Sequence, residues 1–104
     1  QMLEKAFRVV DQNLDNPDFD VPQFCSAMNM SKTLLYSKLK SLTGQSATEF
    51  VRNIRLKEAR KLLQQNAHQR TISEIAYMVG FNDPLYFSRC FRKYFGIPPS
   101  EIEN

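Results

Sequence analysis

Residues 80–91 read GFNDPLYFSRCF, and this stretch decides the fold of the chain. Gly80 tolerates a left-handed backbone, which a sharp turn between two helices needs. Asp83 is a good cap for a following helix, and Pro84 suits the first helical position. The stretch therefore predicts a tight turn and a second helix behind it, which is the arrangement of a helix-turn-helix.

The aromatic residues of this stretch are spaced to hold the second helix against a core. At about 100° per residue, Phe87, Phe91 and Tyr94 face the same side of the helix, and we expect them to be buried. Phe81 follows the turn and is expected to fill the core behind it. Arg89 falls on the opposite face and is expected to point to solvent or to a ligand.

The same order of residues occurs twice in the chain. A shift of 51 positions aligns an earlier set of apolar and turn residues with the quoted region: Val21, Phe24, Cys25, Met28, Asn29 and Met30 fall on Ile72, Ile75, Ala76, Val79, Gly80 and Phe81. After one inserted residue, a shift of 52 aligns Leu35, Leu39 and Gly44 with Phe87, Phe91 and Gly96. Asn29 is the informative match, because asparagine also tolerates a left-handed turn. The repeat favours two helix-turn-helix units over a plain helical bundle.

Helical spacing of apolar residues continues along nearly the whole chain, and no stretch alternates as a strand would. Capping residues and glycine stops divide it into six or seven helices. We expect these helices at about residues 3–14, after Asp20, and at 31–43, 46–65, 71–79 and 83–95. The predicted fold is all-α, with a first helix-turn-helix subdomain at 1–45, a linker helix at 46–65 and a second subdomain at 66–104.

Basic residues concentrate in the middle of the chain. Residues 1–30 carry 2 basic and 5 acidic side chains, whereas residues 31–61 carry 8 basic and 2 acidic ones, a net charge of +6. Residues 62–104 carry 4 of each. A local excess of positive charge favours a polyanionic partner, and a solvated helix face is the alternative.

The outward faces of two helices carry the candidate binding residues. On the helix at 31–43, Leu35, Leu39 and Leu42 are expected to face the core, which leaves the opposite face exposed. In a helix-turn-helix the second helix enters the DNA major groove, and its N-terminal half reaches the base edges. We expect base contacts from Thr33, Tyr36, Ser37, Leu85 and Arg89, with Ser88 at the flank of the outward face.

Other polar side chains suit the phosphate backbone. Arg89 can fork onto guanine O6 and N7, whereas a cation one turn later is placed for phosphate. We expect phosphate contacts from Ser31, Lys32, Lys40, Arg52, Arg55, Arg92 and Lys93. A linker helix of about 20 residues spans about 30 Å, and the major groove repeats every ~34 Å along one side of the duplex. The two reading helices are therefore expected to enter successive segments of the groove.

Catalytic, metal-binding and membrane-spanning patterns are missing from the sequence. Cys25 and Cys90 stand far apart with no CxxC pair, and His68 lies between polar residues, where we expect a surface loop. A catalytic or metal site needs partners close by, and a membrane helix needs a run of about 18 apolar residues. We expect a cytoplasmic, non-enzymatic domain with no metal, no cofactor and no membrane contact. An enzyme and a protein-interaction bundle are the rival interpretations, and the narrow RNA major groove disfavours RNA.

Residues 72–102, ISEIAYMVGFNDPLYFSRCFRKYFGIPPSEI, resemble the signature of AraC/XylS-type transcription regulators, I-x-x-I-A-x-x-x-G-F-x-x-x-x-Y-F-x-x-x-F-K/R-x-x-x-G-x-x-P-x-x-Y. Residues 30–63 resemble the family's first reading helix and its R-x-x-R-L-x-x-A-x-x-L-L linker. The resemblance implies two homeodomain-like helix-turn-helix subdomains joined by a long helix, and sequence-specific binding to promoter or operator DNA. It implies base-reading roles for the six residues named above. The chain departs from the pattern at Ile102, where an aromatic is usual, and at Glu103, where a basic residue is usual.

Residues 16–21 (NPDFDV) and 30–59 are similar to the output domain of bacterial hybrid two-component regulators. That similarity implies a longer protein with a sensor, a kinase and a receiver ahead of this module, so histidine kinase activity would lie elsewhere in that protein. We also expect a contact with RNA polymerase. Any dimerisation is expected to use regions outside these 104 residues.

Overall fold

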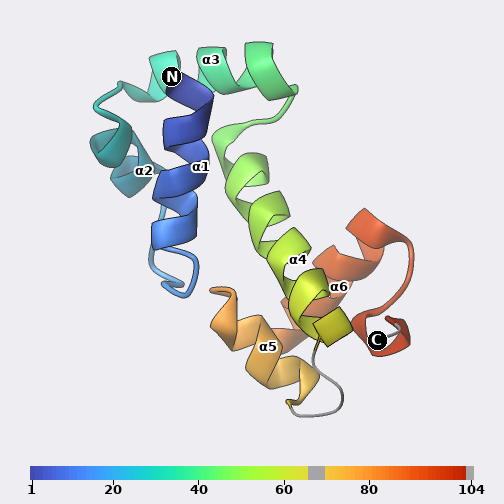
Figure 1. The fold of residues 1–104 in the computed structure, drawn as a ribbon. Coiled ribbons are helices and arrows are strands. Elements are labelled where there is room, and N and C mark those ends of the chain that lie inside the picture. Colours follow the sequence, from blue (N-terminus) through green and yellow to red (C-terminus); the bar gives the residue numbers. More distant parts are fainter. Residues whose placement is uncertain (66–69, 103–104) are drawn as a thin grey trace. The chain divides into compact units, whose positions relative to one another are not determined.

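The computed structural model describes residues 1–65 and 70–102, and within them the chain forms six α-helices and one 3₁₀ helix, with no strand (Figure 1). The α-helices are α1 (Met2–Gln12), α2 (Val21–Met28), α3 (Lys32–Thr43), α4 (Ala47–Gln65), α5 (Ile72–Met78) and α6 (Pro84–Phe95), and the 3₁₀ helix η1 spans Pro99–Glu101. This confirms the all-α prediction. His68 and Glu103 lie outside the described residues.

The helix starts fall where the sequence places capping residues. The Asp20 carboxylate accepts a hydrogen bond from the Gln23 backbone at 3.0 Å at the start of α2. Ser46 and Glu49 form a reciprocal pair before α4, because each backbone N–H donates to the other side chain, at 2.9 Å and 3.1 Å. A second capping box, Thr71 with Glu74, starts α5. These contacts satisfy backbone donors that a helix start otherwise leaves unpaired.

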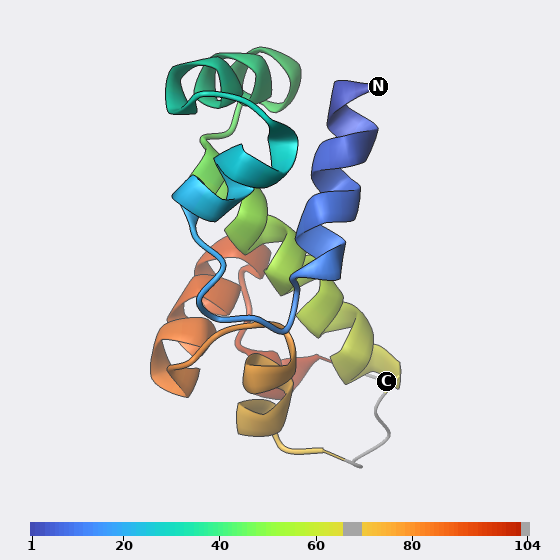
Figure 2. The same cartoon turned by 90° about the vertical axis from the view of Figure 1, so that its left-hand side faces the viewer.

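The chain divides into two compact units, residues 1–13 with 18–52 and residues 14–17 with 53–104. The predicted boundaries, residues 1–45, 46–65 and 66–104, stay a prediction. The long helix α4, one continuous element in Figures 1 and 2, is shared between the units, with its first residues in one and the remainder in the other. The loop that follows α1 belongs to the second unit.

The first unit is built from α1, α2, α3 and the start of α4. Helix α2 packs against both α1 and α3. Phe50 from α4 joins this core, with its ring centroid 5.1 Å from that of Phe7 and 6.0 Å from that of Phe24. Leu35 and Leu39 of α3 are fully buried, as their spacing predicted.

The second unit is organised around a row of phenylalanine rings. Neighbouring centroids are 5.1 Å apart for Phe81 and Phe87, 5.7 Å for Phe87 and Phe91, and 4.6 Å for Phe91 and Phe95. The buried core residues here are Leu56, Ala59, Leu63, Ile75, Ala76, Val79, Phe81, Phe87 and Phe91. Ile102 packs against this core although it replaces the expected aromatic. The burial of Phe81, Phe87 and Phe91 confirms the prediction made from the quoted stretch.

Two residues expected in the core are instead exposed. Leu42 is 57% exposed, because it lies in the last turn of α3, beyond the buried pair of leucines. Tyr94 is 40% exposed and packs edge-on against the Phe95 ring at 4.8 Å. Phe95 takes the inward place that we had predicted for Tyr94, since it packs directly against the core.

Candidate nucleic-acid interface

The two helix-turn-helix elements share the same turn hydrogen bonds. In the first, Asn29 takes a left-handed conformation at φ 56° and ψ 44°, and the Met30 N–H donates to the Cys25 carbonyl at 3.0 Å. In the second, the Phe81 N–H donates to the Ala76 carbonyl at 3.0 Å. Met30 and Cys25 each lie 51 positions before their counterparts, Phe81 and Ala76, so the turns confirm the internal repeat.

Gly80 is the turn residue of the second element. Its φ of +90° lies in the region that residues with a side chain rarely adopt, and its N–H donates to the Tyr77 carbonyl at 3.1 Å. Asn29 is the only described residue other than glycine with a positive φ. The sequence therefore placed both left-handed turns correctly, because few residue types tolerate this backbone.

A polar side chain caps the start of each candidate reading helix. The Ser31 hydroxyl accepts a hydrogen bond from the Leu34 N–H at 3.1 Å at the start of α3. The Asp83 carboxylate accepts one from the Leu85 N–H at 3.0 Å at the start of α6, where Pro84 occupies the first turn. Because a hydroxyl keeps its own hydrogen to donate, Ser31 remains available for the predicted phosphate contact.

The side chains predicted to read bases lie on the faces of α3 and α6 that point away from the buried residues. Thr33, Tyr36 and Ser37 are exposed on α3. On α6, Leu85 is 75% exposed and Arg89 is exposed. Ser88 is half-buried, so it is less accessible than the other five residues predicted to read bases. On each of the two helices, the predicted base-reading residues lie on one face and two fully buried side chains hold the opposite face in the core.

Most of the predicted phosphate-binding cations are also exposed. Lys32 and Lys40 of α3 and Arg92 and Lys93 of α6 are exposed. The Lys40 ammonium donates to the Gly44 carbonyl at 3.1 Å, near the C-terminal end of α3. That contact satisfies one of three ammonium hydrogens, so two remain for a phosphate. Arg52 of α4 is half-buried.

Arg55 is not placed as a phosphate contact, and this prediction needs correction. Its side chain is only 6% exposed. Its guanidinium group donates from Nη1 to the Val79 carbonyl at 3.2 Å and from Nη2 to the Asn16 carbonyl at 2.9 Å. Burial lowers the pKa of Arg55, while the nearby Asp15 carboxylate raises it. An arginine keeps its charge over the accessible pH range, so the residue is a buried cation held by backbone oxygens.

The sequence did not indicate that Arg55 is buried. It also did not indicate that a second arginine packs on an aromatic ring. Arg60 of α4 stacks over the Phe95 ring, with its guanidinium carbon 4.6 Å from the centroid. A neighbouring lysine, Lys61, pairs with Glu58 at 3.5 Å across one helical turn. The positions of the cations along α4 give no signal that separates a buried arginine from a stacked or exposed one.

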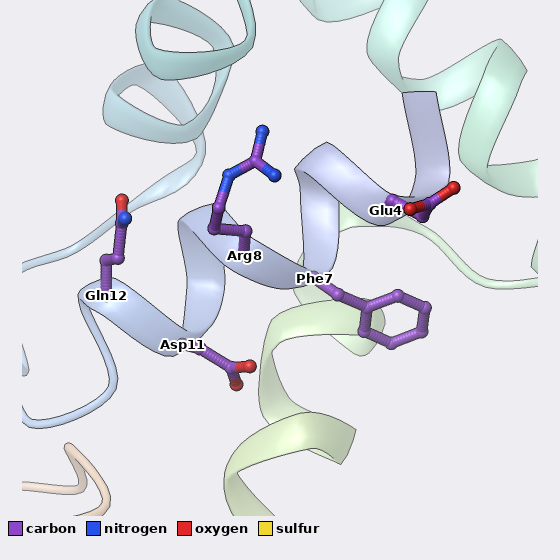
Figure 3. A pocket seen from close by; sticks show the side chains of 5 residues that line it. All are labelled: Glu4, Phe7, Arg8, Asp11 and Gln12. Carbon is purple, nitrogen blue, oxygen red and sulfur yellow. The ribbon is translucent and has the colours of Figure 1, made fainter. Parts of the chain in front are cut away.

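A shallow hollow on α1 is lined by Glu4, Phe7, Arg8, Asp11 and Gln12 (Figure 3). All five side chains come from a single helix, and they point in different directions. The hollow is lined by side chains of both charges, and its polar groups do not converge. We therefore do not regard it as a binding site.

Among the described residues, none of the helices has the length and apolar character to cross a membrane. Within the same residues, no group of three or more histidine, cysteine, aspartate or glutamate side chains gathers where it could hold a metal ion.

The chain matches known proteins over nearly its whole length. A family model described as a helix-turn-helix domain matches residues 24–104. Histidine kinase P4 from Formosa agariphila is 44% identical over 104 residues, which are 100% of this chain and 7% of that protein. The transcriptional activator RhrA from Rhizobium meliloti is 36% identical over 95 residues, which are 91% of this chain and 30% of that protein. The chain therefore corresponds to a minor part of these curated relatives.

A solved structure from Chromobacterium violaceum, a transcriptional regulator described among AraC-type DNA-binding domain-containing proteins, has the same fold. It superposes with a TM-score of 0.86 at 26% identity, covering 96% of this chain and 87% of that one.

Proposed function

Because this chain belongs to the AraC-type helix-turn-helix family of DNA-binding domains, we propose that it binds double-stranded DNA sequence-specifically to regulate transcription. The observation that carries the proposal is the repeated turn, which presents an exposed polar face on α3 and another on α6. In a helix-turn-helix the second helix reads the major groove. We propose that α3 and α6 enter successive groove segments of one duplex.

The chemistry of each exposed side chain indicates whether it suits a base edge or a phosphate. Arg89 provides the planar fork that fits guanine, and Leu85 provides an apolar contact for a thymine methyl. The hydroxyls of Thr33, Tyr36 and Ser37 suit base edges near the start of α3. Exposed cations further along each helix suit phosphates, which fix the register and carry no sequence information.

We propose that the domain is the output module of a larger signal-responsive regulator. The support is the match to a protein named as a histidine kinase, of which this chain covers 7%. In such a protein the catalytic parts lie outside this domain, and the domain itself acts by binding. We further propose that it works on DNA in the cytoplasm, that it contacts RNA polymerase and that dimerisation, where it occurs, uses other parts of the protein.

Selection of bound sites from a pool of random DNA duplexes tests the proposed function. We expect a defined site with two groups of preferred base pairs, one for each reading helix. Affinity for that site should exceed affinity for random duplex, because specific binding adds base contacts to the phosphate term. Recovery of no enriched sequence would contradict the proposal.

A salt titration on the selected site separates DNA binding from a protein-interaction role. With six or more phosphates neutralised, affinity should fall by about 10³-fold or more between about 50 and 200 mM salt. An RNA duplex of the same sequence serves as the matched control, since its narrow major groove excludes the reading helices. A nearly flat titration, or equal binding to the RNA duplex, would contradict major-groove recognition.

A further inference from the structure

Arg55 is buried in the second unit, and its guanidinium contacts two segments that are distant from it in sequence. From α4 its guanidinium reaches the Val79 carbonyl at the end of α5 and the Asn16 carbonyl in the loop after α1. The nearby Asp15 carboxylate also acts electrostatically on this cation. The hydrogen bond to the Val79 carbonyl is buried and the one to the Asn16 carbonyl is partly buried, and buried hydrogen bonds of this kind are costly to lose.

The same guanidinium packs directly against the turn of the second helix-turn-helix. A β-carbon built at Gly80 would collide with Arg55 Nη1 and with the Leu14 carbonyl oxygen. At Gly44 and Gly96, which are also left-handed, a β-carbon would meet no atom within 4 Å. Gly80 is therefore required for space as well as for backbone conformation.

Residues 14–17 also lie against this turn. They belong to the second unit, although α1 before them and α2 after them belong to the first. Arg55 bonds to this loop through Asn16, and the Leu14 carbonyl borders Gly80. The Arg55 guanidinium and the Leu14 carbonyl thus both lie close to the position of a β-carbon at Gly80.

We propose that Arg55 is a positioning residue that locks the Val79–Gly80 turn against the Leu14–Pro17 loop, and that base reading by α6 depends on this lock. The inference rests on the proposed function. Arg55 touches no DNA in this scheme. It acts through the turn, because the direction in which α6 leaves the turn sets where Arg89 arrives, and directional base contacts tolerate little misplacement.

Arg55→Lys tests the proposal in the whole domain. Lysine keeps the positive charge but lacks the planar fork that serves two acceptors at once. We expect affinity for the selected duplex to fall by roughly 5- to 150-fold, the range for loss of one good base contact. Preference should flatten at the base pairs that Arg89→Ala also flattens. The slope of log affinity against log salt should stay unchanged, because no phosphate contact is lost.

Arg52→Ala is the matched control on the same helix, one turn earlier. As a phosphate contact, it should lower the salt slope by about 1 and leave base preference intact. If Arg55→Lys weakens all duplexes alike and leaves base preference intact, Arg55 does not position α6 for base reading and the proposal is overturned.

A double-mutant cycle tests the lock without DNA, by urea unfolding of the parent, Arg55→Ala, Gly80→Ala and the double variant. Removing the guanidinium removes one of the two groups with which a β-carbon at position 80 would collide, the other being the Leu14 carbonyl. The midpoint shift of the double variant should therefore be smaller than the sum of the two single shifts, because residues in contact are not additive. Additive shifts would overturn the proposal. A parent domain that binds no duplex selectively would contradict the proposed function, and this cycle would still decide whether Arg55 holds the turn.

Discussion

The guanidinium group of Arg55 fills the space beside Gly80 in which a β-carbon at that position would lie. Glycine at φ +90° allows the turn, and the absence of a side chain allows the arginine to reach the carbonyl of the preceding residue, Val79. The two residues are 25 positions apart in sequence. Gly80 is therefore required both for its backbone conformation and for the space that Arg55 occupies.

Gly80→Ala should destabilise the domain more than Gly44→Ala. Both positions are left-handed, and alanine there costs about 1–2 kcal/mol from the backbone alone. Only at position 80 must the new β-carbon also displace an arginine and a backbone carbonyl. Thermal unfolding of the two variants measures the difference, and Gly80→Val should be the most severe. Asn29→Gly is the tolerated control, since glycine adopts the same backbone. Equal melting temperatures for Gly80→Val and the parent would contradict the prediction.

Arg89→Ala and Arg92→Ala should affect DNA binding in different ways. Arg89 lies in the N-terminal half of α6, where base edges are within reach, so its loss should cost about 1–3 kcal/mol on the selected site and relax preference at one base pair. Arg92 lies in the last turn, so its loss should weaken all duplexes alike and lower the salt slope by about 1. Competition binding against random duplex measures both. If Arg89→Ala weakens selected and random DNA equally, its assigned role is wrong.

Leu85→Ala and Phe87→Ala separate the reading face of α6 from its anchoring face. Phe87 is fully buried between two other phenylalanine rings, so truncation should destabilise the domain by about 3–5 kcal/mol. Leu85 is 75% exposed, so its truncation should change stability by no more than about 0.5 kcal/mol while reducing preference for a thymine. Urea unfolding and site selection on both variants provide the check. A large loss of stability with Leu85→Ala would show that this side chain is packed.

The two capping boxes should make stability depend on pH in the acid range. Backbone and side-chain hydrogen bonds from Ser46 lower the pKa of Glu49 below its ordinary value of 4.5, and those from Thr71 do the same for Glu74. Because these pKa values are lower in the folded state, the contribution is present above about pH 4.5 and is lost as pH falls through the folded pKa values. The variant with both glutamates changed to glutamine should be less stable than the parent near neutral pH and should approach it in acid.

Urea midpoints across the acid range measure this convergence. Glu4→Gln is the control for net charge, because Glu4 also lies in a first helical turn but belongs to no capping box. A gap between parent and double variant that stays constant as pH falls well below 4.5 would contradict the assignment, since linkage requires the gap to narrow there.

Features that depend only on neighbouring residues were predictable from the sequence. Caps at Asp20, Ser46 and Thr71, the left-handed turns at Asn29 and Gly80, and the helical spacing of buried residues are all set within one or two turns of chain. Their physics is local, because a cap needs a donor three residues away and a turn needs a tolerant backbone. This is why the six helices and the repeat of the helix-turn-helix were predictable.

Which long side chains are buried, and what they contact, depends on the tertiary structure. Leu42 and Tyr94 had the right spacing for a core and are exposed, whereas Phe95 lies against it. Arg55 resembled its cationic neighbours in sequence and is buried, because two carbonyls from segments 39 and 24 residues away converge on its guanidinium. A charged side chain can be buried only where distant chain segments bring acceptors to it. The sequence pattern along α4 does not indicate that these two carbonyls meet at Arg55.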